Sequence, residues 1–171
     1  MGDPVPDADI QIAWATDPAT VRDAALFLAR AVRTDTAYIS HGEIQQGLSP
    51  DGKSWAPDLE QRFLNAAADY DDARSVLVAR DGGVLVGAAI VHWDLDGAAR
   101  FATLEDIAVA PQRRSAGVGD TMFREIERET TRRGGAWIFL ESGLQNARAH
   151  AFFDRAGFQV VSKVFAKRLD Q

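Results

Sequence analysis

One stretch near the middle of the chain constrains the fold more than any other, because it reads as a strand, a turn and a helix in immediate succession. The expected strand ends near Val109, the turn spans Pro111–Arg114, and the helix opens at Gly117 and Gly119. Glycines at the start of a helix let backbone N–H groups approach a bulky anion, and the helix dipole adds partial positive charge there. The stretch therefore predicts an α/β fold with an anion site of pyrophosphate size. A plain glycine-containing loop is the alternative interpretation.

Hydrophobic periodicity predicts a single domain over residues 1–171, built on a mixed, mostly antiparallel sheet of about seven strands flanked by four helices. The predicted order is β-α-α-β-β-β-α-β-α-β-β. In chain order, the expected elements are strand Ile10–Trp14, helix Thr20–Arg33, helix Asp58–Tyr70, strands Ser75–Arg80, Val84–Trp93 and Ala99–Val109, helix Gly117–Arg133, strand Ala136–Glu141, helix Asn146–Ala156, and strands within Phe158–Leu169.

Composition excludes several classes of protein. With 46% hydrophobic and 26% charged residues, the chain has the composition of an ordinary globular protein, and we expect mobility only in residues 1–8. No apolar run reaches the roughly 18 residues of a membrane helix, and the start lacks an export signal, so we expect a cytoplasmic protein without membrane partners. Zero cysteines exclude disulfides and a thiol nucleophile, and the three histidines show no metal spacing. We therefore expect no metal site.

Charge is distributed unevenly along the chain. The net charge is −6, yet the first 72 residues carry 13 acidic and 5 basic side chains while the remainder is slightly basic. This balance disfavours nucleic acid as a partner, because phosphate backbones require a basic face. It favours a cationic partner for the first half and an anionic one for the second. A solvated acidic surface is the alternative.

Two common phosphate-binding motifs do not fit the glycine-containing segment. A Walker loop requires Gly-Lys-Ser/Thr, whereas this chain has Gly119-Asp120-Thr121. The dinucleotide fingerprint requires a third small residue where Met122 stands, and antiparallel hairpins precede this strand-helix unit. The anion site therefore belongs to another class.

Two segments resemble motifs of the GCN5-related N-acetyltransferase (GNAT) superfamily, whose members transfer acetyl from acetyl-CoA to amines. The first is Arg114-Ser-Ala-Gly117-Val-Gly119, behind a strand, and is similar to the family pattern Gln/Arg-x-x-Gly-x-Gly/Ala. The second runs from Glu141 through Asn146 to Phe158. The two motifs are as far apart in the chain as they are in the family, and the resemblance covers about residues 99–169. It implies a sheet that splays apart between its fourth and fifth strands, with the thioester of acetyl-CoA in the gap.

The resemblance also implies which residues bind acetyl-CoA. The backbone of residues 114–119 would wrap the pyrophosphate, and Ile107 and Val109 would pair with pantetheine through the main chain. Asn146 would face the pantetheine arm, and it also suits a helix N-cap. The cofactor-binding residues expected on this basis are Ile107, Val109, Arg114, Ser115, Ala116, Gly117, Val118, Gly119, Asn146 and Phe153.

Phe153 departs from the family pattern. Relatives often carry a tyrosine at this position, whose phenol donates a proton to the departing CoA thiolate. Phenylalanine cannot donate, so another group, water or unassisted departure must serve, which a thiol pKa of about 8.5 permits. His150, one turn earlier on the same helix, is a candidate, with a surface role as the alternative.

An amine acceptor must lose a proton, and two glutamates are predicted as the catalytic base. Glu105 lies on the fourth strand, on the side expected to hold Thr103, Ile107 and Val109, and Glu141 ends the fifth strand. The alternative for each is a solvated or salt-bridged acid.

Residues 35–57 occupy the acceptor-binding position of relatives. Ser40 and Glu43 have capping-box spacing within this region. From these features we expect an enzyme that acetylates a primary amine of a cationic small molecule by direct attack on acetyl-CoA. A non-catalytic CoA-binding regulatory module and a peptide N-terminal acetyltransferase are the alternatives, and the sequence is compatible with a homodimer.

Overall fold

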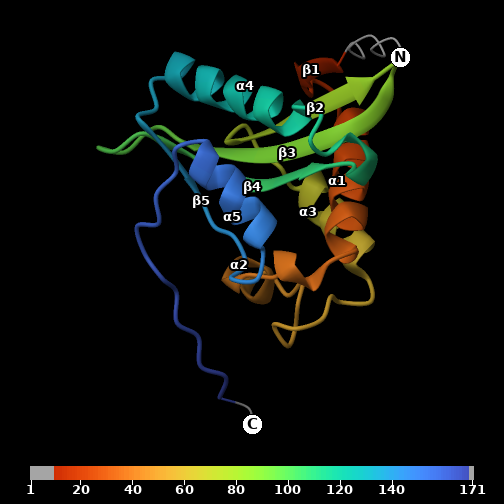
Figure 1. The fold of residues 1–171 in the computed structure, drawn as a ribbon, viewed down its shortest axis with the longest axis vertical. Coiled ribbons are helices and arrows are strands. Elements are labelled where there is room, and N and C mark those ends of the chain that lie inside the picture. Colours follow the sequence, from red (N-terminus) through yellow and green to blue (C-terminus); the bar gives the residue numbers. More distant parts are fainter. Residues whose placement is uncertain (1–9, 170–171) are drawn as a thin grey trace, which may run out of the picture.

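The computed structural model describes residues 10–169 and has one five-stranded sheet in the order β1-β2-β3-β4-β5. The first three strand pairs are antiparallel, and β4 and β5 are parallel. Figure 1 shows α1 and α3 on one side of the sheet and α4 and α5 on the other. The elements are β1 (Ile10–Trp14), α1 (Pro18–Arg33), α2 (His41–Gln45), α3 (Leu59–Ala68), β2 (Arg74–Asp81), β3 (Val84–Asp94), β4 (Phe101–Val109), α4 (Val118–Arg132), β5 (Trp137–Leu140) and α5 (Ala147–Arg155), with short 3-10 turns at Thr36–Tyr38 and Pro111–Arg113.

Local signals explain most of the boundaries. Helix α1 begins earlier than predicted, because the carboxylate of Asp17 accepts a hydrogen bond from the backbone of Thr20 and Pro18 occupies the first turn. Thr20 is therefore the residue that is capped and not the cap. The β2–β3 hairpin turns through Gly82 and Gly83, both at positive φ, as the Asp-Gly-Gly sequence predicts.

The sheet separates two hydrophobic layers. Leu28 of α1 and Leu59 and Phe63 of α3 pack on one face, against a layer that includes Ile90 and Ala108. Met122, Phe123 and Ile126 of α4 pack on the other face, with Phe152 and Phe153 of α5 beside them. Burial of one large apolar side chain contributes about 1.5–3 kcal/mol to stability. The two layers therefore hold the helices firmly against the sheet, and the helix ends are held with them.

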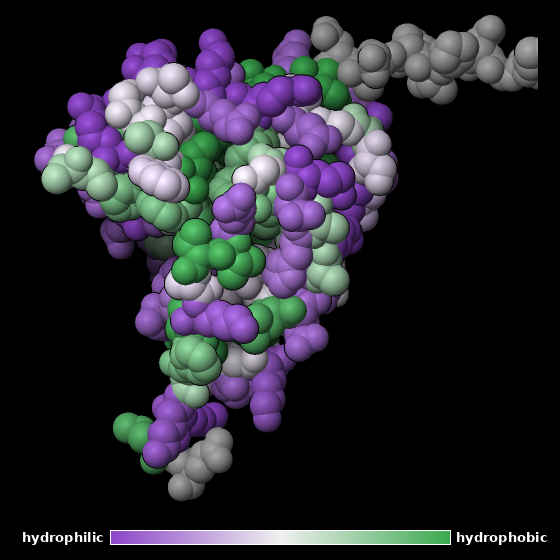
Figure 2. Space-filling view, turned by 60° about the vertical axis from the view of Figure 1, so that its left-hand side comes forward, coloured by the Kyte–Doolittle hydropathy of each residue, from purple (hydrophilic) through white to green (hydrophobic). Residues whose placement is uncertain are grey.

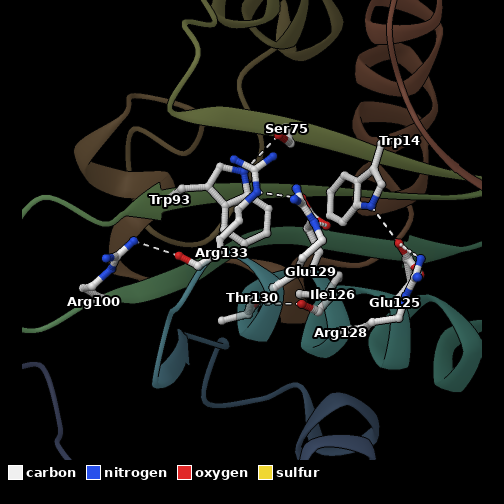
Figure 3. Close-up of polar contacts among 11 residues, drawn as sticks. Trp14, Ser75, Trp93, Arg100, Glu125, Ile126, Arg128, Glu129, Thr130 and Arg133 are labelled. Carbon is white, nitrogen blue, oxygen red and sulfur yellow. Dashed lines mark hydrogen bonds and ion pairs between the residues drawn. The ribbon is translucent and has the colours of Figure 1, made fainter.

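Helix α4 is fixed to the sheet by polar contacts along its length (Figure 3). Trp14 Nε1 donates to Glu125 Oε1 at 2.8 Å, and the Arg133 guanidinium lies 4.4 Å from the Trp93 ring centroid. Gly87 of β3 allows the close approach, because a Cβ there would lie 2.7 Å from Met122 Sδ. These contacts hold α4 against the sheet from Met122 to Arg133.

The C-terminal segment differs from the prediction. No strand is found in residues 158–169, so the described part of the chain has five strands and not about seven. Residues 159–169 are exposed and have no regular secondary structure, and strand pairing needs a partner edge that they do not meet within residues 10–169. The predicted mobile start, residues 1–8, lies outside the described residues. No helix in residues 10–169 is both long and apolar enough to cross a membrane.

Candidate functional site

A groove of about 590 Å³ opens where β4 and β5 diverge. The two strands pair only from Phe101 with Trp137 to Leu104 with Leu140, although β4 continues to Val109. Beyond Leu104 the free side of β4 faces the groove, and the β5–α5 loop and α5 form the opposite wall. This divergence is the splayed gap between the fourth and fifth strands that the motifs imply.

The start of α4 closes one end of the groove with unpaired backbone donors. Gly117 caps the helix at φ 75°, and Ser115 is the one non-glycine residue with positive φ among those described. The first N–H of α4 that bonds backward is that of Thr121, to Gly117 O at 2.9 Å. The three preceding N–H groups of α4 have no backbone partner in the described chain, and a Cβ on Gly117 would meet nothing within 4 Å. This end is open and suited to an anion.

The two arginines beside this helix start are held in place. Arg114 Nε donates to Val109 O at 3.2 Å, which ties the loop to the end of β4. Arg113 forms an ion pair with Asp81 of β2. Both side chains line the groove, so their charge adds to the positive potential of the helix end.

Helix α5 forms the other wall. Asn146 is 7% exposed and caps α5, since its side-chain oxygen accepts from Ala149 N at 3.2 Å. The predicted N-cap role is therefore confirmed, and Asn146 also lines the groove. Phe153 packs at 5.5 Å from Phe152 and 5.7 Å from Phe158 between ring centroids, and it lines the groove.

A β-bulge reverses the side-chain alternation of β4 at Glu105. Ile90 pairs with Asp106 and the next residue, Val91, pairs with Leu104, so Glu105 is the extra residue. After the bulge Ile107 and Val109 face the α4–α5 layer, whereas Ala108 faces the α1–α3 layer. The expectation that Glu105 shares a face with Ile107 and Val109 is therefore wrong. Because one residue is inserted, every later side chain of β4 lies on the face of the sheet opposite to the one that simple alternation predicts.

Both predicted glutamates have partners. Glu105 accepts two hydrogen bonds from the Arg74 guanidinium, at 2.9 and 3.0 Å. Glu141 Oε2 lies 2.7 Å from His41 Nδ1, and its Oε1 accepts from Ser40 Oγ at 2.6 Å and from Gly42 N at 3.0 Å. Glu141 thus ties the end of β5 to the start of α2, and the catalytic role of either glutamate stays a prediction.

The capping box expected at Ser40 and Glu43 is confirmed. Glu43 Oε2 accepts from Ser40 N at 2.7 Å, and the Ser40 side chain accepts from Gly42 N. This pair begins α2 inside the polar region 35–57. It also turns Glu43 toward the groove, which it lines.

Asp106 is a groove residue that the sequence analysis did not select. Its carboxylate accepts no hydrogen bond from the described residues, and burial, with further contributions from Glu43 and Glu105, raises the pKa of Asp106 to about 8. Burial, with smaller contributions from the same Asp106 and Glu105 charges, raises the pKa of the Tyr70 hydroxyl. The signal available in the sequence was the Glu105-Asp106 pair, but only the bulge decides which acid lacks a partner.

The structure brings most of the predicted site residues to one groove. Ala116 and Val118 do not line it, and the Val118 side chain is 2% exposed within the core. His150 is exposed and also lies outside the lining. No group of metal-ligating side chains was found in residues 10–169. The predicted residues that line the groove are Glu105, Ile107, Val109, Arg114, Ser115, Gly117, Gly119, Glu141, Asn146 and Phe153.

The sequence profile of the Acetyltransferase (GNAT) family matches residues 41–158, more than half of the chain. The protein therefore belongs to the GNAT acetyltransferase family. Comparison with curated protein sequences found no significant match.

Solved structures with the same fold have various descriptions. Aminoglycoside N-acetyltransferase AAC(6')-Iy in complex with CoA is 17% identical, with a TM-score of 0.66 and 95% of each chain covered. A transcriptional regulator from Bacillus halodurans C-125 is 19% identical, with a TM-score of 0.67 over 94% of this chain and 99% of that one. Ribosomal-protein-alanine N-acetyltransferase from Brucella melitensis biovar Abortus 2308 is 19% identical, with a TM-score of 0.60 and coverage of 94% and 99%. At these identities the similarity establishes the fold.

Proposed function

We propose that the protein is an acetyl-CoA-dependent N-acetyltransferase whose acceptor is the primary amine of a cationic small molecule. One observation carries the proposal: a single groove has unpaired helix N–H groups at one end and a group of carboxylates further along β4. The helix N–H groups suit a pyrophosphate, and the carboxylates suit an ammonium group. Family membership and the aminoglycoside acetyltransferase of similar fold support the same reading.

The residues present fit acetyl-CoA. The left-handed backbone at Ser115 and Gly117 leaves the helix N–H groups open, and the free side of β4 offers main-chain groups at Ile107 and Val109. Asn146 can donate its amide hydrogens from the facing wall while its oxygen caps α5. Together these residues would hold the pyrophosphate and the pantetheine arm.

The acceptor end is acidic. Glu43, Glu105 and Asp106 line the same part of the groove, and the charges of Glu43 and Glu105 both act on Asp106. A bound ammonium group would favour ionisation of Asp106, because an opposite charge stabilises the carboxylate. The acidic first half of the chain would attract such a cation over longer range.

Acetyl-CoA supplies the thioester: the amine nitrogen bonds to the acetyl carbon, the carbon–sulphur bond breaks, and the nitrogen releases one proton as the amide forms. Before the attack, the bound ammonium group must release another proton to become a neutral nucleophile. We propose Asp106 as the group that accepts this proton, directly or through one water. A carboxylate with a pKa near the working pH suits general-base catalysis. Arg74 would hold Glu105 beside it, and Glu141 would keep α2 against the groove.

Phe153, which lines the groove, offers the departing sulphur no phenol proton. His150 lies outside the groove lining, so we propose that the sulphur leaves as a thiolate or takes its proton from water. A thiol pKa of about 8.5 makes such a leaving group acceptable near neutral pH.

A regulatory, non-catalytic role is the second candidate, and the fold shared with a protein described as a transcriptional regulator supports keeping it. A peptide N-terminus as acceptor is the third, since a ribosomal-protein-alanine N-acetyltransferase also has this fold. The regulatory protein would bind acetyl-CoA without transferring its acetyl group, whereas the peptide acetyltransferase would transfer that group to a different acceptor.

An amine panel separates the candidates. Polyamines, aminoglycosides, amino-acid amides, peptide N-termini and an anionic amine are incubated with acetyl-CoA, and acetylated products are identified by mass spectrometry. We expect products from cationic small amines, with a KM that rises as salt is added, because screening weakens attraction to the acidic groove. Preference for the anionic amine would overturn the acceptor assignment.

A further inference from the structure

Arg148 brings a positive charge into the groove that no described residue neutralises. It lies in the first turn of α5 and lines the groove, and its Nη2 donates a hydrogen bond to the Tyr38 hydroxyl at 3.3 Å. Within residues 10–169 it forms no ion pair. A guanidinium has five N–H donors, so the neutral phenol leaves most of them without a partner. Arg148 is therefore free to bind an oxyanion.

This charge does not serve the stability of α5. The N-terminal end of a helix carries partial positive charge, so a cation in the first turn is unfavourable, and α5 has no acidic residue there. The other arginines of the groove differ from Arg148. Arg113 pairs with an acid of β2, Arg114 bonds to the end of β4, and Arg155 lies about two turns further along α5, toward the start of α4.

Arg148 faces the acceptor end of the groove and not the pyrophosphate end. The start of α4 lies against Phe152, since a Cβ on Gly119 would lie 3.5 Å from the Phe152 ring. Arg148 lies one turn earlier on α5, and its side chain reaches Tyr38, in the segment that leads into α2 and Glu43. Figure 1 shows the start of α5 beside α2, and Figure 2, which brings this side of the fold forward, shows hydrophilic side chains on it. An anion bound by Arg148 would therefore belong to the acceptor.

The acceptor end also holds more unpaired acid than one amine requires. Glu105 is neutralised by Arg74, whereas Glu43 accepts hydrogen bonds only from its own helix cap and Asp106 accepts none within residues 10–169. Two carboxylates without a basic partner suit two ammonium groups, and Arg148 adds a site for one carboxylate. A molecule with two ammonium groups and one carboxylate keeps one net positive charge, as the proposed cationic acceptor requires.

We propose that the acceptor is a basic amino acid with a free carboxylate, and that Arg148, oriented by Tyr38, binds this carboxylate. The inference rests on the proposed function, because it assigns the substrate of the same groove. One ammonium group lies beside Asp106, where it loses its proton and attacks the thioester, and the other lies beside Glu43. A carboxylate is favoured over a phosphate, because one planar guanidinium matches one carboxylate and a second negative charge would find no other unpaired base among the described residues at this end.

The test compares two substrates that differ only in the carboxylate. L-lysine and cadaverine have the same carbon chain between two amines, and cadaverine has a hydrogen where lysine has its carboxylate. Both are assayed at saturating acetyl-CoA with the wild type, Arg148→Gln and Arg148→Lys. Arg22→Gln is the matched control, since Arg22 is exposed and lies outside the groove lining. Thermal melting of each variant confirms that it remains folded.

For the wild type and Arg22→Gln we expect kcat/KM to be at least about tenfold higher for lysine than for cadaverine, because the diamine lacks the charge-assisted hydrogen bonds to Arg148. Arg148→Gln should lower the lysine value at least about tenfold, through KM, and change the cadaverine value less than about twofold. Arg148→Lys should recover part of the lysine value, since it keeps the charge without the planar fork.

Two results would overturn the inference and leave the proposed function standing. The wild type could acetylate cadaverine as well as lysine, or Arg148→Gln could lose the same factor with both substrates. Transfer to no amine at all would overturn the proposed function and this inference with it.

Discussion

Asp106→Asn tests how the groove handles the acceptor's proton. With a pKa of about 8, Asp106 is about 1% ionised at pH 6 and about 50% ionised at pH 8. If its carboxylate takes the proton from a bound ammonium group, kcat/KM for the amine should rise about 50-fold between these pH values and level off above pH 8. A rate that followed only the neutral fraction of an amine with a pKa near 10 would instead keep rising about tenfold per pH unit. The asparagine variant should lose the rise that levels off, and its kcat at pH 8 should fall by about 10²-fold or more.

The assay is initial-rate acetyl transfer at saturating acetyl-CoA over pH 6 to 9 at fixed ionic strength. Asp96→Asn, at an exposed position in the β3–β4 turn, is the matched control and should keep the wild-type profile. Glu105→Gln and Glu141→Gln are measured in parallel, because both remain candidate bases. An unchanged profile in Asp106→Asn would refute the reasoning, and loss of the rise in either glutamine variant would transfer the role to that glutamate.

The same raised pKa has a consequence for stability. The folded state holds the Asp106 proton up to about pH 8, whereas the unfolded chain releases it near the ordinary aspartate pKa of 3.8. The folded state therefore binds more protons in this window, and the free energy of unfolding should decrease as pH rises from about 4 to 8. Asp106→Asn should flatten this dependence in urea unfolding, and a variant with the wild-type slope would contradict the assignment.

Three further substitutions test the surroundings of the groove. Gly143→Ala should lower the free energy of unfolding by about 1–3 kcal/mol, because its Cβ would overlap Ala37 O and lie 2.6 Å from Ile39 O, both backbone atoms. Gly42→Ala should cost less in the same urea titration, since its Cβ meets the movable Glu141 carboxylate; the reverse order would contradict this account. Phe153→Tyr should raise kcat with an unchanged KM for acetyl-CoA, and an unchanged kcat would show that departure of sulphur does not limit the rate.

Most of this fold was predicted from local sequence signals. Each helix or turn signal involves residues that are close together in the chain, so it can be recognised without knowledge of the tertiary contacts. Hydrophobic period and glycine terminators located α1, α3, α4 and α5, whereas the short helix α2 was not predicted. The glycines at positions 117 and 119 located the start of α4 within one residue. The groove between β4 and β5 followed from the family motifs on either side of it.

What the sequence did not reveal depends on contacts between distant segments. The bulge at Glu105 arises from pairing with β3, and it decides that Arg74 takes Glu105 and leaves Asp106 unpaired. The bond from Ser40 to Glu141 joins residues 101 positions apart. Residues 158–169 have strand-like composition, but a strand forms only where an edge receives it.

The central claim is that this groove binds acetyl-CoA and transfers its acetyl group, and release of the CoA thiol tests it most directly. The chain contains no cysteine, so a thiol reagent reports CoA alone. Gly117→Ala and Gly117→Glu share the strain of a side chain at φ 75°, but only the glutamate places negative charge at the helix start. Repulsion of about 2 kcal/mol would weaken acetyl-CoA binding about 30-fold. We predict amine-dependent thiol release by the wild type and Gly117→Ala, and at least a tenfold loss at subsaturating acetyl-CoA in Gly117→Glu; equal rates in the two variants, or binding of acetyl-CoA with no thiol release for any amine, would contradict the claim.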